Sequence, residues 1–151
     1  MNRFAWLLTL TVALAAAVAL NKGIHRFRGV FRLGFYTPVI TSIVLRDSAE
    51  VFDQHPIEAE HVAEQARTIL EDVTLAAWKV GFLGNADNVA AVAEILSDYP
   101  DVPLVAYMPS LGWVDEDELQ NYMEAFRELI LPAAEVLVGN HKTLTDFLLP
   151  D

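Results

Sequence analysis

Cysteine is absent from the 151-residue sequence, so the chain forms no disulfide bond and offers no thiolate nucleophile or cysteine-based metal site. Acidic residues are absent from residues 1–32, where five Lys and Arg give a net charge of +5. Residues 33–151 hold the other five Lys and Arg and all 21 Asp and Glu, which gives a net charge of −16. A domain with this charge repels nucleic acid, so no nucleic-acid partner is expected.

Residues 4–20 contain no charged residue, and a helix of these 17 residues spans about 25 Å, the short end of a membrane span. Three interpretations of this segment stay open. We favour a signal-anchor helix that crosses the membrane. The alternatives are a cleaved signal peptide, and a buried strand over residues 7–12 followed by an alanine-rich helix.

The charges that flank the apolar segment predict its orientation. Four Lys and Arg follow it and one precedes it, which by the positive-inside rule places the rest of the chain in the cytoplasm. We therefore predict localisation at the inner (cytoplasmic) membrane, with a soluble cytoplasmic protein as the alternative. The predicted organisation is an N-terminal apolar segment over residues 1–21, a basic juxtamembrane linker over 22–32 and an α/β domain over 33–151.

Strand and helix patterns alternate along residues 33–151. Apolar runs predict strands over residues 38–45, 76–83, 102–108 and 135–140. Amphipathic patterns between these runs predict helices over residues 57–73, 86–99 and 115–129, and a last helix that begins near residue 143. This alternation favours a three-layer α/β fold, in which a parallel sheet of about four strands carries helices on both faces. Ligands of such sheets bind beyond the carboxyl ends of the strands.

Three stretches of the domain carry a family resemblance. They read LGFYTPVITSIVLRDS at residues 33–48, WKVGFLGNADNVAAVAEILSDYPDVPLV at 78–105 and ELILPAAEVLVGN at 128–140. Together they resemble the hydroxymethylpyrimidine/phosphomethylpyrimidine kinases, which have the ribokinase-like fold and phosphorylate the pyrimidine precursor of thiamine with Mg-ATP. The resemblance covers roughly residues 33–149 and implies a partial ribokinase-like fold.

The resemblance also implies where ligand-binding residues stand. Arg46 occupies the place of a Gln that reads the pyrimidine in the family, and Phe82 occupies the place of a methionine. Lys79, Gly81 and Gly84 keep the family residues around Phe82. Near the phosphate-binding end, the motif VGNHKT keeps Asn140 but has Thr143 where the family has Glu.

Several family features that support phosphoryl transfer are missing from the sequence. The strand over residues 102–108 ends without the acidic residue of the family, and VALAAAVALNKG replaces a glycine-rich loop after the first strand. We expect the second half of the fold, with its anion hole and ATP site, to be absent. Because phosphoryl transfer depends on positioning and on neutralisation of charge, these losses predict little catalytic power.

We therefore predict a non-catalytic, membrane-anchored member of this family that acts through protein–protein interaction in a membrane-associated complex. The alternative is a hydroxymethylpyrimidine/phosphomethylpyrimidine kinase, or a residual pyrimidine- or ATP-binding module of thiamine biosynthesis, and only this alternative requires Mg-ATP. No catalytic residue and no metal site is assigned. The expected partners are another protein or a second copy of the chain, and a membrane through residues 4–20. The residues that we assign to a vestigial ligand site are Arg46, Lys79, Gly81, Phe82, Gly84 and Asn140.

Overall fold

The computed structural model describes residues 8–13 and 37–149, which form two three-stranded sheets and a set of helices. The antiparallel sheet has the order β1-β2-β3, and the parallel sheet has the order β4-β5-β6. The strands are β1 (Leu8–Ala13), β2 (Pro38–Arg46), β3 (Val51–Pro56), β4 (Trp78–Val80), β5 (Leu104–Met108) and β6 (Val136–Gly139). The helices are α1 (Ala59–Asp72), α2 (Ala86–Ser97), α3 (Glu116–Ala125) and α4 (His141–Leu148); α3 continues into a π-helical turn η2 (Phe126–Ile130) and a 3-10 turn η3 (Leu131–Ala133).

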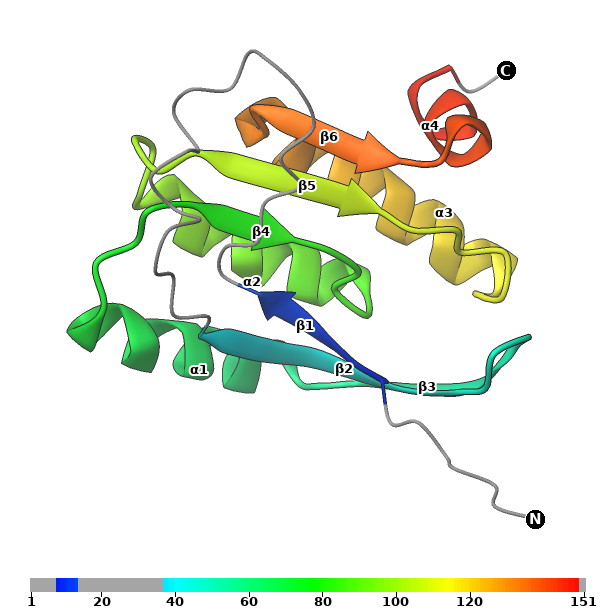
Figure 1. The fold of residues 1–151 in the computed structure, drawn as a ribbon, viewed down its shortest axis with the longest axis horizontal. Coiled ribbons are helices and arrows are strands. Elements are labelled where there is room, and N and C mark those ends of the chain that lie inside the picture. Colours follow the sequence, from blue (N-terminus) through cyan, green and yellow to red (C-terminus); the bar gives the residue numbers. More distant parts are fainter. Residues whose placement is uncertain (1–7, 14–36, 150–151) are drawn as a thin grey trace.

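The two sheets lie edge to edge, with β1 beside β4 (Figure 1). The predicted strands at residues 38–45, 76–83, 102–108 and 135–140 are confirmed as β2, β4, β5 and β6. The prediction that all four belong to one parallel sheet is wrong, because β2 pairs antiparallel with β1 and β3.

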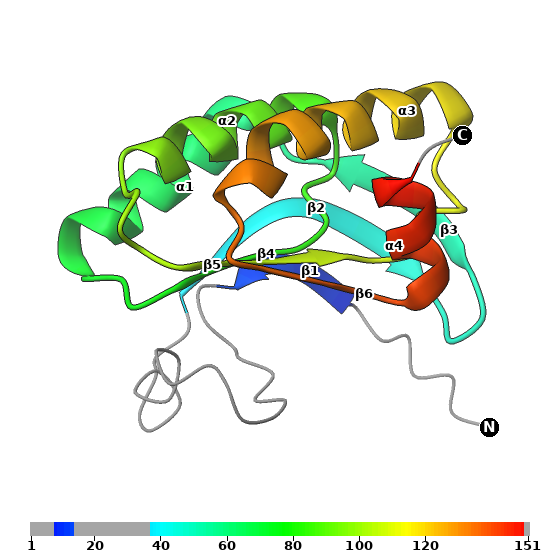
Figure 2. The ribbon, with the colours of Figure 1, turned by 90° about the horizontal axis from the view of Figure 1, so that it is seen from above.

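The prediction of helices on both faces is wrong for the described residues, since α1, α2 and α3 all lie on one side of the sheets (Figure 2). The order β4-β5-β6 explains this arrangement. Right-handed crossovers that proceed in one direction along a sheet place all of their helices on the same face, and helices reach the other face only where the strand order reverses.

Residues 8–13 form strand β1, so the predicted helix over residues 4–20 is wrong for this part of the segment. The sequence LTLTVA carries three β-branched residues, Thr9, Thr11 and Val12, which favours a strand over a helix. The alternative interpretation, a strand over residues 7–12, agrees with β1. Within residues 8–13 and 37–149, no helix is long and apolar enough to cross a membrane. The rest of the predicted span and the predicted linker at 22–32 lie outside the described residues.

Strand β3 was not predicted, because VFDQHP is polar and Pro56 suggested the start of a helix. The turn from β2 into β3 explains the hairpin. The Asp47 carboxylate accepts hydrogen bonds from the amides of Ala49 (2.7 Å) and Glu50 (2.9 Å), which closes a tight turn. These bonds also lower the pKa of the Asp47 carboxyl group, because they stabilise its charged form.

A β-bulge at Thr41 sets the face of β2 that meets the core. Ile40 and Ser42 pair with consecutive residues of β1, which leaves Thr41 without a partner there. The bulge turns Thr41 and Ser42 inward together, and both are fully buried. The Thr41 carbonyl is thereby free to accept a hydrogen bond from the Ile57 amide (2.9 Å), where the chain leaves β3 toward α1.

The buried side chain of Asn88 on α2 joins the two sheets. Its Nδ2 lies within hydrogen-bond distance of the carbonyl oxygens of Thr41 on β2 (3.1 Å), Ile57 before α1 (3.0 Å) and Leu83 after β4 (2.9 Å). Asn88 is fully buried, and its backbone amide donates to the side chain of Asn85, which caps α2 (2.9 Å). One amide group therefore fixes the relative position of three chain segments.

We expect Asn88→Asp to destabilise the protein by about 3 kcal/mol or more, because it places a carboxylate among three carbonyl oxygens and removes their donor. The matched control is Asn85→Asp. An aspartate there keeps the capping acceptor and suits the positive end of the helix dipole, so stability should change by less than about 0.5 kcal/mol. Urea unfolding measures both values, and equal effects of the two substitutions would contradict the role of Asn88.

Candidate functional site

The carboxyl ends of β4, β5 and β6 lie at one edge of the parallel sheet (Figure 1). Residues 81–85 follow β4, residues 109–115 follow β5, and Asn140 follows β6. Ligands of parallel sheets bind at this edge, so it is the candidate functional site.

The loop after β4 is held in one conformation by hydrogen bonds from three other elements. The Thr41 hydroxyl of β2 donates to the Phe82 carbonyl (3.2 Å), and the Leu83 amide donates to the Tyr122 hydroxyl of α3 (3.1 Å). The Gln54 side chain of β3 donates to the Gly84 carbonyl (2.8 Å). Because these bonds come from two strands of the antiparallel sheet and from a helix, the loop is part of the rigid scaffold.

Two glycines of this loop differ in their surroundings. Gly84 has φ +98°, and a Cβ there would lie 3.1 Å from the Thr41 carbonyl oxygen and 3.2 Å from the Ser42 Cβ. Gly81 has no atom within 4 Å of the position that a Cβ would take. Glycine is therefore required by backbone geometry at position 84, whereas at position 81 there is room for a larger group.

An aromatic cluster fills the space under the loop. The Phe82 ring packs edge-on against Trp113 (5.3 Å between centroids) and tilted against Tyr122 (5.2 Å). The cluster continues through Phe126 to Phe147 of α4. Phe82 is 2% exposed, so the side chain at this predicted ligand-binding position belongs to the core.

Burial raises the pKa of the Tyr122 phenol well above its ordinary value of 10.0, and the hydrogen bond from the Leu83 amide offsets this rise only in part. The phenol therefore stays neutral and acts as a hydrogen-bond acceptor for the loop. It does not supply a base at neutral pH.

Asn140 caps the helix that follows β6. Its side chain accepts a hydrogen bond from the Thr143 amide (2.8 Å). Thr143 stands at the position of the family glutamate and has no charged side chain. A Cβ on Gly139 would lie 3.0 Å from the Met108 carbonyl oxygen and 2.9 Å from the Leu144 side chain. The end of β6 therefore approaches the end of β5 closely.

Arg46 and Lys79 do not join the other predicted site residues. Ser42 is the part of β2 that contacts Gly84, and Arg46 lies four residues further on, about 13 Å along the strand. Lys79 alternates with the buried Trp78 and Val80, so its side chain leaves the opposite face of the sheet. The structure thus brings Phe82, Gly81 and Gly84 together at the edge and places Asn140 at the end of a neighbouring strand.

Three polar contributors to the site were not predicted: Gln54, Asn88 and Tyr122. The position of Asn88 carried a signal, because it shares a face of α2 with Val92 and Ile95 and a polar side chain on a core face needs partners. Gln54 and Tyr122 act through long-range contacts for which the sequence carries no local signal.

Metal ligands are lacking at this edge. Within the described residues, no group of three or more His, Asp or Glu side chains is arranged to hold a metal ion. The segment after β5 reaches its first acidic residue only at Asp115, the N-cap of α3.

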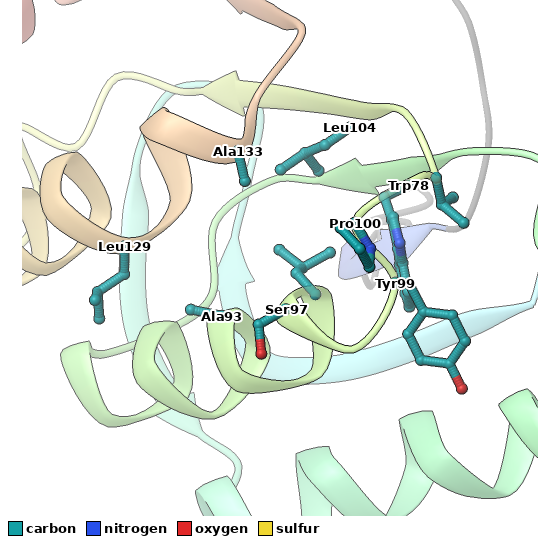
Figure 3. Close-up of a pocket in the computed structure, with 10 residues that line it drawn as sticks. Trp78, Ala93, Ser97, Tyr99, Pro100, Leu104, Leu129 and Ala133 are labelled. Atoms are coloured by element: carbon teal, nitrogen blue, oxygen red, sulfur yellow. The ribbon is translucent and has the colours of Figure 1, made fainter.

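A separate cavity of about 260 Å³ lies at the other end of the parallel sheet, where β4 and β5 begin (Figure 3). Trp78, Tyr99 and Leu129 are among its lining residues, and no charged side chain lines it. The Trp78 and Tyr99 rings pack edge-on at 6.0 Å between centroids. The cavity is an apolar seam between α2 and the start of the sheet, remote from the candidate site.

Two solved structures share the fold. Phosphomethylpyrimidine kinase from Clostridium difficile 630 aligns with 82% of this chain and 54% of its own, with a TM-score of 0.66 and 19% identity. A structure described as the last common ancestor of two groups of vitamin kinases (HMPPK and PLK/HMPPK) aligns with 76% of this chain and 50% of its own, with a TM-score of 0.56 and 27% identity. The fold is thus a partial vitamin-kinase fold.

Sequence relatives agree with the structural ones. Hydroxymethylpyrimidine/phosphomethylpyrimidine kinase of Haemophilus influenzae is 32% identical over 126 residues, which cover 83% of this chain and 45% of the relative. The thiamine biosynthetic bifunctional enzyme TH1 of Arabidopsis thaliana is 27% identical over 113 residues, 73% of this chain and 21% of the relative. The profile of the phosphomethylpyrimidine kinase family matches residues 30–149, and the chain belongs to this family. It spans about half the length of the Haemophilus protein. The predicted family resemblance is confirmed.

We expect Gly84→Ala to destabilise the protein by about 2 kcal/mol, because an L-residue at φ +98° is strained and its Cβ meets the Thr41 carbonyl. Gly81→Ala is the matched control, three residues away, and should change stability by less than about 1 kcal/mol. The free energy of unfolding in urea measures both. A Gly84→Ala variant as stable as the control would show that the backbone at position 84 is not constrained as described.

Alkaline pH should destabilise the protein in part through Tyr122. The unfolded phenol loses its proton from a pH of about 10, whereas the folded phenol keeps it to higher pH, so this contribution to stability is complete below about pH 10 and falls above it by about 1.4 kcal/mol per pH unit. Between about pH 10 and 11, Tyr122→Phe should therefore lose about 1 kcal/mol less stability than the unmodified chain. Tyr107→Phe, at an exposed position, is the control and should follow the unmodified chain. Identical pH profiles for all three proteins would contradict this assignment.

Proposed function

We propose that this chain is a pyrimidine-binding domain of thiamine biosynthesis, derived from the substrate-binding half of a phosphomethylpyrimidine kinase. The observation that carries the proposal is the loop over residues 81–84, which stands at the carboxyl end of β4 and has open space beside Gly81. The family match and the name of the Haemophilus relative supply the chemical class of the ligand.

The arrangement of the loop suits binding of a small planar ring. Its backbone is fixed by Thr41, Gln54 and Tyr122, so a ligand would meet a preorganised surface and little conformational entropy would be lost on binding. Trp113 packs against Phe82 beside this surface and offers a further aromatic contact.

Phosphoryl transfer by this chain alone has less support. The reaction needs metal-bound phosphates and a positive surround for the transferred group. At the described strand ends, Thr143 donates its amide to Asn140, and no acidic side chain follows β5 before Asp115. We therefore assign ligand binding, and not catalysis, to the site, and no residue of it is given a catalytic role.

A non-catalytic role in protein–protein contacts is the second candidate. The face of the sheets that carries no described helix favours it (Figure 2). The inner-membrane location remains a prediction, and alkaline extraction of membranes from cells that express the chain tests it.

We expect calorimetric titration of the full chain with hydroxymethylpyrimidine to give a saturable binding heat that does not require Mg-ATP. Gly81→Val should weaken binding at least about tenfold, because two methyl groups would enter the open space beside the loop. The matched control is Ala76→Val, an exposed position just before the amino end of the same strand, which should bind as the unmodified chain does. Absence of binding heat at millimolar pyrimidine, with and without Mg-ATP, would overturn the proposed function.

A further inference from the structure

The side chain of Gln54 reaches the candidate site from a strand of the other sheet. Gln54 pairs with Val44 of β2, and residues paired across an antiparallel ladder share a face of the sheet. Val44 is buried, so this face is the one that meets the core. From there, the Gln54 Nε2 donates to the Gly84 carbonyl in the loop after β4 (2.8 Å).

Only one end of the Gln54 amide is used in this contact. A carboxamide has two N–H donors on Nε2 and a carbonyl oxygen, Oε1, that can accept two hydrogen bonds. Within the described residues, Nε2 donates to Gly84 and Oε1 accepts no hydrogen bond. The side-chain atoms buried there without a partner are Thr37 Oγ1, Trp78 Nε1 and Asn88 Oδ1, so Gln54 Oε1 is accessible.

Gln65 of α1 shows the contrasting case, an amide whose two ends are both bonded to the chain. Its Oε1 accepts from the Ile40 amide (3.2 Å), and its Nε2 donates to the Ile40 carbonyl (3.2 Å). Gln65 therefore joins α1 to β2 and has no acceptor left for a ligand in that geometry. Gln54 instead keeps an acceptor and a second N–H at the edge of the parallel sheet, where ligands bind.

The Gly84 carbonyl fixes which end of the Gln54 amide a ligand would meet. A carbonyl oxygen can only accept, so Nε2 faces it, and turning the amide over would bring two acceptors together. The site thus offers an acceptor and a donor side by side in a fixed order. Because the amide is already held in place, little side-chain entropy is lost when a ligand binds.

A carboxamide recognises a ring that carries an amino group next to a ring nitrogen. The amino group donates to the amide oxygen while the ring nitrogen accepts from the amide N–H, as when Asn or Gln pairs with adenine. Hydroxymethylpyrimidine has this arrangement, because its amino group adjoins a ring nitrogen. Its deaminated analogue has an oxo group and a ring N–H instead, which reverses donor and acceptor.

We propose that Gln54 is a specificity-determining residue of the pyrimidine site, whose amide binds the amino group and the adjacent ring nitrogen and so selects aminopyrimidines against oxopyrimidines. The inference rests on the proposed function and adds a ligand contact to the bond that Gln54 makes with Gly84. The chain from Gly81 to Gly84 spans at most about 11 Å, so a substituted ring beside Gly81 lies within reach of this amide.

Calorimetric titration of the full chain with the two pyrimidines tests the proposal. The unmodified chain should bind hydroxymethylpyrimidine at least ~10-fold more tightly than its oxo analogue, which is the discrimination that one bidentate pair supplies. Gln54→Met keeps the length of the side chain and removes the amide, so the two affinities should become equal to within about twofold. Loss of the Gly84 bond alone would weaken both ligands alike and leave their ratio unchanged.

Gln65→Met is the matched control. It makes the same substitution and also removes hydrogen bonds between two elements, but it leaves the amide of Gln54 in place. The ratio of the two affinities should therefore stay as in the unmodified chain. Circular dichroism of both variants verifies that each is folded.

The side-chain amide signals in NMR spectra of the unmodified chain give a second measurement, which does not require that a variant binds. The Gln54 signal is assigned by its loss in Gln54→Met. It should shift on titration with hydroxymethylpyrimidine, whereas the signal of Gln65 should not.

Equal binding of both pyrimidines by the unmodified chain would show the proposal to be wrong while the proposed function stands. A preference that persists in Gln54→Met has the same meaning, and so does a Gln54 amide signal that does not shift when the ligand is bound. If the unmodified chain gives no binding heat with either pyrimidine, the proposed function fails and this inference fails with it.

Discussion

The amide of Asn88 is the constraint on which the rest of this structure depends. The strands form two separate sheets, so no ladder of backbone hydrogen bonds joins β1 to β4, the described strands at which the sheets meet. The connection is made by side chains: Asn88 reaches Thr41, Ile57 and Leu83, and the Thr41 hydroxyl reaches Phe82. A buried amide with satisfied donors resists displacement, because moving any of these segments would leave polar groups without partners in the core.

The loop after β4 gains its fixed shape from this connection. Leu83 and Gly84 are held from β3, α2 and α3 at once, and the glycine at position 84, with its positive φ, lets the loop approach Thr41 and Ser42 of β2 closely. A member of the phosphomethylpyrimidine kinase family thus keeps a rigid loop at the strand ends even though carboxylates are lacking there. Preorganisation of a loop and the chemistry of phosphoryl transfer are separable: among the described residues the loop after β4 is fixed by hydrogen bonds, while the segment after β5 has no acidic residue before Asp115.

The strands and helices that were predicted correctly are those that local sequence patterns determine. Apolar runs gave β2, β4, β5 and β6, and helical periodicity gave α1, α2 and α3, because in these segments propensity, pattern and tertiary structure agree. The hairpin strand β3 was missed, since its polar residues are tolerated only at the edge of the sheet beside β2. Segment LTLTVA was assigned to a helix by its hydropathy, whereas pairing with β2 makes it a strand. For the site, the family motifs located Gly81, Phe82, Gly84 and Asn140, but the sequence could not show that Phe82 is a core residue or that Arg46 lies elsewhere. Both depend on the bulge at Thr41 and on long-range packing.

Native-state hydrogen exchange tests most directly whether side-chain bonds unite the two sheets into one folding unit. The Ile57 amide bonds to Thr41 and reports on the antiparallel part, and the Trp78 amide bonds to Pro103 and reports on the parallel part. If the two sheets unfold as one unit, both amides exchange with the free energy of global unfolding. Exchange of the Ile57 amide at a free energy lower by more than about 1 kcal/mol would show that the antiparallel sheet opens independently, and would contradict this account.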